Sequence, residues 1–276
     1  MCWRTTFVAI VAFVAVDTYV FGQVQDAAES AEIGSFLIRT YRGGPDQQQV
    51  LKYCLGLRKQ LQQYWLPTGK LTAWSPPCEI VLHRTRAAYL RAVGGQGGQT
   101  KGSSLIQFDR QRIVKRRVDL LVNDRGETPA LLHEIAHVFL ADLFPGQRPP
   151  RWIAEGIATM VDSAEKQILH HRDCREALTS GTALRVGHLL TLQEFQSAEQ
   201  VAPFYGQSLS LVRFLAEQDK PSQLIAFSKT AMAHGYDHAL RQFYGFDGVA
   251  DLEQRWQDYA TAARKSSIQP VSMTTE

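Results

Sequence analysis

Cysteine is scarce in this sequence, and its positions match no cysteine-based metal site. Zinc ribbons and fingers use closely spaced cysteine pairs, whereas Cys2, Cys54, Cys78 and Cys174 lie far apart. Removal of the N-terminal segment would leave Cys54, Cys78 and Cys174. In an oxidising compartment these allow one disulfide and one free thiol, and the sequence leaves their pairing open.

An excess of charge of one sign is also lacking. The formal net charge of +3 is too small to indicate a nucleic-acid-binding protein. One local basic cluster is present, and we interpret it as a solvated hairpin, with attraction of acidic substrates as the alternative. Its members are Arg110, Arg112, Lys115, Arg116 and Arg117.

Long hydrophobic runs are confined to the beginning of the chain. Arg4 precedes an apolar stretch from Phe7 to Val16, and Val20-Phe21-Gly22 suits a cleavage site. This pattern predicts a signal peptide over residues 1–22 and export to the periplasm or the cell exterior. The stretch is short for a membrane span and is followed directly by Asp17. We therefore expect no stable membrane insertion after cleavage, with an N-terminal membrane anchor as the alternative.

A phosphate-binding loop is missing too. Residues 94–102 are glycine-rich, but no Gly-Lys-Ser/Thr sequence follows a predicted strand in the required order. The segment is interpreted as a mobile loop.

The sequence does contain a compact chemical motif, His133-Glu134-Ile135-Ala136-His137. Histidines four residues apart on a helix share one face, where two imidazoles can bind one Zn²⁺ at about 2.0–2.1 Å. Glu134 lies beside the first histidine, where a carboxylate can reach a water at the metal without ligating it. The alternative is an amphipathic helix that carries polar residues inward.

The residues around this motif favour a buried helix. Thr128 is a good N-cap, and Pro129 suits the first helical position. The helix is predicted to end near Phe144-Pro145-Gly146. Because its other residues are mostly apolar, the His-Glu-His group would be costly to bury without partners. A metal and its water would supply those partners.

A catalytic zinc needs a third protein ligand and an open position for water. Glu155 is the first candidate, in a predicted second helix from Arg151 to Asp162, where Gly156 permits close helix packing. Asp162, His170 and His171 are weaker alternatives. Adjacent histidines on a polar helix are more often surface residues.

At these residues the chain resembles a known family. HEIAH followed by WIAEGIA is similar to the gluzincin metallopeptidases, in particular the bacterial exported "peptidase MA-like" domain proteins. The resemblance extends from about residue 33 to 264. It implies that His133, His137 and Glu155 bind one Zn²⁺ and that Glu134 is the general base. Thermolysin-like enzymes have an aspartate four residues after the glutamate ligand, where this chain has Thr159.

Tyr205 extends the resemblance. Zinc aminopeptidases carry a tyrosine at the start of a similar helix, with a small residue three places later, as Tyr205 and Ser208 do here. There the phenol stabilises the oxyanion, and a phenol O–H is a suitable donor to developing negative charge. The alternative is an ordinary core or surface tyrosine.

The predicted fold class is α+β. Strands are expected at residues 35–40, 79–83, 104–108 and 113–122, and helices at residues 45–65 and 86–93, before a mainly helical remainder. By resemblance, this is a gluzincin, thermolysin-like core in which a small antiparallel or mixed sheet precedes the HExxH helix. We expect a zinc-binding α+β lobe over residues 31–180, a helical lobe over 181–264 and a disordered tail over 265–276.

These features predict an exported zinc metallopeptidase whose partner is a peptide or protein substrate. Zinc aminopeptidases hold the substrate amine with a Gly-x-Met-Glu-Asn segment, which is absent here, so endopeptidase action is favoured. Two alternatives remain: an inactive or non-peptidase binding protein with the same fold, and a structural zinc protein. Structural sites usually have four protein ligands, and the sequence offers three at the expected positions.

Overall fold

The computed structural model describes residues 30–66, 73–94 and 100–262. These residues divide into two compact units, one ending at Gln147 and the other made of residues 63–68 and the chain from Arg148 onward. The predicted signal peptide, most of the glycine-rich loop and the predicted tail lie outside the described residues. The expected lobe boundaries stay a prediction.

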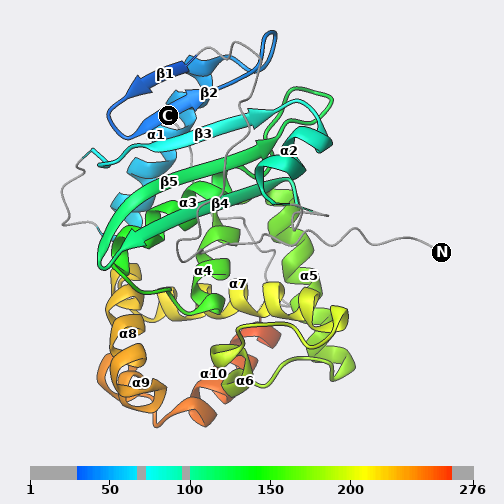
Figure 1. The fold of residues 1–276 in the computed structure, drawn as a ribbon. Coiled ribbons are helices and arrows are strands. Elements are labelled where there is room, and N and C mark those ends of the chain that lie inside the picture. Colours follow the sequence, from blue (N-terminus) through cyan, green and yellow to red (C-terminus); the bar gives the residue numbers. More distant parts are fainter. Residues whose placement is uncertain (1–29, 67–72, 95–99, 263–276) are drawn as a thin grey trace. The chain divides into compact units, whose positions relative to one another are not determined.

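The first unit is α+β, as predicted, and is organised around a five-stranded mixed sheet in the order β1-β2-β3-β5-β4 (Figure 1). The strands are β1 (Ser30–Ile33), β2 (Phe36–Arg39), β3 (Cys78–His83), β4 (Gly102–Asp109) and β5 (Arg112–Leu121). β2, β3 and β5 run parallel, and β1 and β4 pair antiparallel with their neighbours. β4 is thus an edge strand of the described sheet.

The helices among the described residues of this unit are α1 (Gln47–Trp65, largely in it), α2 (Arg86–Ala92) and α3 (Leu131–Leu143). The strands alternate, so that one face of the sheet carries fully buried residues such as Ile80, Ser104 and Val118. α3 packs against β4 and β5. The sheet therefore supports the helix that carries the HEIAH motif.

The start of α3 differs from the prediction. Thr128 does not cap the helix, because Leu131 N–H donates to the Thr128 carbonyl and closes a turn over Pro129 and Ala130. The first helical hydrogen bond runs from Glu134 N–H to the Ala130 carbonyl. The predicted end of the helix agrees with the structure, in which Phe144 is the C-cap.

The second unit is helical. Its elements are α4 (Arg151–Met160), α5 (Ala164–Ser180), α6 (Val186–Thr191), the 3-10 turn η1 (Ala198–Gln200), α7 (Val201–Gln218), α8 (Pro221–His234), α9 (Tyr236–Tyr244) and α10 (Val249–Ala262). α7 is the central helix, because α4, α5, α8 and α10 all pack against it. The short elements β1 and α6 were not predicted from the sequence.

No helix among the described residues is both long and apolar enough to cross a membrane.

Candidate metal centre

The HEIAH residues lie on a helix that is buried on nearly all sides. His133, Glu134 and His137 are only 5%, 1% and 4% exposed. The two imidazole rings lie one helical turn apart, with centroids separated by 4.8 Å. The apolar remainder of α3 forms the core contacts, so the helix holds these three polar groups where few solvent molecules reach them.

Glu155 lies on α4, where residues 152–160 are all buried. The first turn of this helix is fixed by Trp152, whose indole N–H donates to the Tyr236 hydroxyl at 3.0 Å. That hydroxyl in turn donates to the Leu190 carbonyl at 3.1 Å. α4 is therefore anchored through its neighbours in the helical unit as well as by its own apolar residues.

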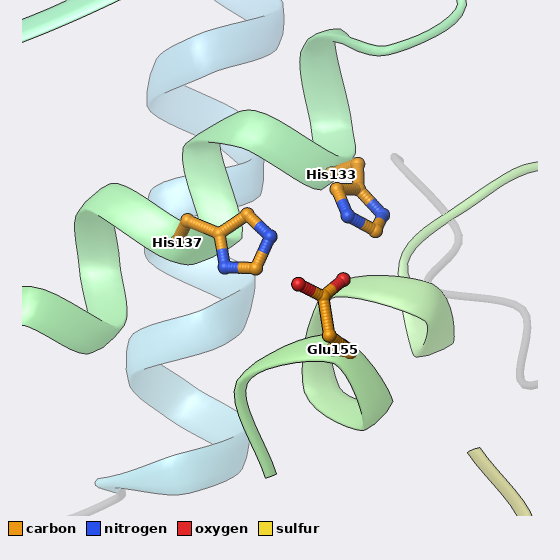
Figure 2. A group of neighbouring side chains, drawn as sticks. All are labelled: His133, His137 and Glu155. Atoms are coloured by element: carbon orange, nitrogen blue, oxygen red, sulfur yellow. The ribbon is translucent and has the colours of Figure 1, made fainter. Parts of the chain in front are cut away.

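Figure 2 shows the two histidine rings and the Glu155 carboxylate pointing toward one another. Each residue offers one ligand atom, and these three atoms all lie within 4.8 Å of one another. Within the described part of the chain, this is the group of histidine, cysteine or acidic side chains that could hold a metal ion. The other third-ligand candidates, Asp162, His170 and His171, are not members of it.

The donor set fits Zn²⁺. Ligand atoms at about 2.0–2.1 Å from one tetrahedral zinc lie roughly 3.4 Å apart, so small side-chain rotations bring the three atoms to a common ion. Two imidazoles and one carboxylate form the ligand set of catalytic zinc sites, which leave a position open for water. The three cysteines in the described residues do not compete, because Cys54, Cys78 and Cys174 are buried and unbridged. Burial raises the pKa of Cys54 and of Cys174 to about 12, which keeps both thiols protonated.

Glu134 occupies a space created by a missing side chain. A Cβ atom at Gly102, the first residue of β4, would lie 2.8 Å from both Cγ and Oε1 of Glu134 and 2.6 Å from the Ala130 Cβ. The glycine thus lets the end of the edge strand approach the carboxylate directly. This contact could not be predicted from the sequence, in which Gly102 is the end of a glycine-rich segment.

Tyr205 is on the second turn of α7 and is 3% exposed. α4 approaches the same helix closely, since a Cβ at Gly156 would lie 2.6 Å from the Ser208 carbonyl oxygen and 2.5 Å from Val212. Glu155 precedes Gly156, and Tyr205 lies one turn before Ser208. Packing within the helical unit therefore places the Tyr205 segment beside the segment that carries Glu155.

The adjacent histidines are half-buried rather than fully exposed on this polar helix. The side chain of His170 is 16% exposed, and its ring stacks on Tyr205. His171 contacts the Arg213 guanidinium. Burial and the nearby positive charge of Arg213 lower the pKa of His171 to about 4, so it is neutral at physiological pH.

The basic cluster is also only partly solvated. Arg116 is 5% exposed and pairs with Asp142, while it also donates to the Pro76 carbonyl at 2.7 Å. Arg117 pairs with Asp119 and Glu79. These two arginines therefore make ion pairs and hydrogen bonds within the α+β unit. This corrects the interpretation of the whole cluster as a solvated hairpin.

Comparison with known proteins gives one family. The model described as the Peptidase MA superfamily matches residues 110–262, more than half of the chain. The matched segment includes the HEIAH motif, Glu155 and Tyr205. No curated protein matched the sequence.

Proposed function

This chain belongs to the peptidase MA superfamily, and we propose that it is a zinc metallopeptidase that hydrolyses internal peptide bonds. The observation that carries the proposal is the buried group of His133, His137 and Glu155, with their ligand atoms within 4.8 Å of one another. Glu134, next to the first ligand, adds the base that a purely structural site does not need.

His133, His137 and Glu155 would hold the zinc. When bound, Zn²⁺ supplies a Lewis acid that lowers the pKa of a water toward about 7. The protein contributes a rigid arrangement: α3 is fixed by the sheet, and α4 by α7 and by the Trp152–Tyr236 hydrogen bond. A nearly dry site strengthens the electrostatic interactions made in it.

Glu134 is assigned the proton transfers. Its carboxylate takes a proton from the water that attacks the peptide carbonyl carbon, and it then passes this proton to the departing amine. Tyr205 is assigned the stabilisation of the oxyanion: its phenol donates a hydrogen bond to the carbonyl oxygen as negative charge develops there. Both residues are almost fully buried, which suits groups that act on a reacting bond shielded from water.

The substrate is proposed to be an extended peptide. β4 is an edge strand of the described sheet and begins at Gly102, in contact with Glu134. An extended chain that adds to such an edge gains main-chain hydrogen bonds, while side-chain pockets provide selectivity. In gluzincins the corresponding strand pairs with substrate, and we assign β4 the same part. The missing Gly-x-Met-Glu-Asn segment favours cleavage away from the N-terminus.

We also propose that the protein acts outside the cytoplasm. The support is the basic, apolar and small-residue sequence over residues 1–22. The alternative of an N-terminal anchor is distinguished by the mass of the mature chain: cleavage near Gln23 removes the first 22 residues, whereas an anchor retains them.

The central test is cleavage of an unbiased peptide library by the wild type and by Glu134→Gln side by side. We expect the variant to bind zinc normally and to lose about 10²–10⁴-fold in kcat, the range for loss of a general base. His137→Ala should lose both zinc and hydrolysis. Full activity in purified Glu134→Gln protein would refute the assignment.

The position of cleavage needs a separate test. Each cleaved peptide is compared with its N-acetylated form, which lacks the free amine but keeps the sequence. An endopeptidase cleaves both at similar rates. A strict requirement for the free N-terminus would show an aminopeptidase instead.

A second candidate function is that of an exported binding protein with the same fold, and the observation in its favour is the identity of residue 159. Thr159 is completely buried at the position where thermolysin-like enzymes have an aspartate, and such outer groups orient histidine ligands and tune metal affinity. Zinc binding and hydroxamate binding without cleavage of any library member would favour this candidate. A fully closed structural zinc site would bind no hydroxamate.

A further inference from the structure

The aromatic surroundings of Tyr205 have a polar member that the proposed mechanism does not use. The Tyr205 ring stacks on the His170 imidazole, with centroids 5.7 Å apart and planes inclined by 29°. Phe204 packs against Tyr205 edge-on at 5.5 Å, and Phe195 lies at 6.4 Å. Of these three rings, the His170 imidazole is therefore the one that lies nearly parallel to the phenol ring.

The stack depends on an unusually close approach of α5 and α7. A Cβ atom at Gly206, directly after Tyr205, would lie 2.5 Å from the His170 carbonyl oxygen and 2.6 Å from the Cys174 nitrogen. Both are backbone atoms, so neither can turn aside as the end of a side chain could. Gly206 thus brings the Tyr205 turn of α7 against the turn of α5 that begins at His170.

His170 also has a carboxylate near it on α5. Its Nδ1 lies 3.8 Å from Oδ2 of Asp173, one turn further along α5. Asp173 is 8% exposed and also lies 4.0 Å from Arg172. The separation between His170 and Asp173 is longer than a hydrogen bond.

His170 is not a member of the group of described residues that could hold a metal ion. We infer that His170, stacked on the phenol ring, is a positioning residue that keeps the Tyr205 phenol in the orientation required to donate to the reacting carbonyl oxygen. This inference rests on the proposed function for its catalytic consequence. The contact itself does not depend on zinc.

The first test detects the contact between His170 and Tyr205 by NMR and does not depend on enzymatic activity. In the full chain labelled with ¹³C-tyrosine, the ring resonance of Tyr205 is identified by its loss in Tyr205→Phe. His170→Ala should shift this resonance and speed the ring flip, since the stacked face is opened. His171→Ala, the same change at the next residue of α5, is the matched control and should leave it in place. An unchanged Tyr205 resonance in His170→Ala would overturn the inference.

The second test measures the effect of this contact on catalysis, with a double-mutant cycle and a peptide that the wild type cleaves. His170→Ala should lower kcat about five- to tenfold, the equivalent of one aromatic contact, with KM and zinc content unchanged. In the Tyr205→Phe background the same substitution should have no further effect. An equal loss in both backgrounds would show that His170 acts independently of Tyr205 and would overturn the inference.

A conservative variant separates stacking from mere filling of space. His170→Phe keeps a flat ring against Tyr205 and should recover most of the kcat that His170→Ala loses. Recovery equal to that of His170→Leu, which fills the space without a flat ring, would contradict the stacking account. If zinc-dependent hydrolysis is absent from the wild type, the proposed function fails. The ¹³C experiment then still decides whether His170 holds Tyr205.

Discussion

Two helices carry the candidate catalytic groups, and they are held in different ways. α3 bears Glu134 against a sheet, where the missing side chain of Gly102 makes room for the end of the glutamate side chain. α7 bears Tyr205 among helices, where Gly156 on α4 and Gly206 on α7 make room for backbone atoms of the neighbouring helix. The Glu134 side chain can move away from a methyl group added at Gly102, whereas the Ala130 Cβ at 2.6 Å and the packed backbone beside Gly206 cannot. Gly102 therefore makes room for a functional side chain as well as for the start of α3, whereas Gly206 makes room for the backbone of the neighbouring helix.

Gly206→Ala should produce the largest effect on stability. Its methyl group would meet the backbone of His170 and Cys174, and overpacking of this kind costs about 3 kcal/mol of unfolding free energy. Chemical denaturation of the full chain measures the loss. Gly187→Ala on α6 is the matched control, because its Cβ would meet only Val249 at 3.6 Å. Equal stability of the two variants would contradict the conclusion that Gly206 is required for the close packing of α5 and α7.

The same region should respond to pH through His171. The folded-state pKa of about 4 lies below the ordinary value of 6.5 because of burial and the positive charge of Arg213. The unfolded chain therefore binds a proton first as the pH falls, and unfolding free energy decreases between about pH 6.5 and 4, by up to about 3 kcal/mol.

His171→Gln, which does not titrate and can still accept from Arg213, should show a shallower fall of stability than the wild type over this pH range. Urea denaturation at several pH values provides the measurement. Identical pH profiles for the two proteins would mean that His171 is not neutral in the folded state.

Gly102→Ala should have a smaller effect on stability and a selective effect on activity. The methyl group would press on Glu134 and Ala130, at a cost of about 1–2 kcal/mol. Displacement of the carboxylate should lower kcat about tenfold, because general-base catalysis depends on hydrogen-bonding geometry, while zinc content stays unchanged. Steady-state kinetics and metal analysis test this prediction. A kcat equal to that of the wild type would show that Gly102 does not determine the position of the Glu134 carboxylate.

Gly56→Ala should have the smallest effect and the opposite sign. Gly56 lies within α1, and a Cβ there would meet nothing within 4 Å. Alanine should stabilise the helix by up to about 1 kcal/mol. Thermal unfolding of this variant is the control for Gly102→Ala in the same unit. A destabilised Gly56→Ala protein would show that glycine replacement is costly in this unit for reasons other than close contacts.

The parts of the molecule that the sequence predicted are those governed by local pattern. Apolar periodicity and Pro/Gly breaks located α3, α4 and most later helices, and the spacing of His133 and His137 placed both on one helical face. The start of α3 was wrong by a few residues, since a turn closed by Leu131 and Thr128 replaced the expected cap.

The contacts that the sequence did not predict are long-range. Asp173 lies three residues after His170, so that pair was available to local reasoning. The stacking of His170 on Tyr205 was not, because it depends on how closely two helices approach at Gly206. Likewise, Gly102 and Glu134 meet only when β4 pairs with β5 and α3 packs on both strands.

The most direct test of the account is the zinc content of the purified full chain, compared with that of Glu155→Ala and His170→Ala. We expect about one zinc per chain in the wild type and in His170→Ala, and loss of the metal in Glu155→Ala. Zinc retained in Glu155→Ala, or lost in His170→Ala, would contradict the assignment of His133, His137 and Glu155 as the metal centre.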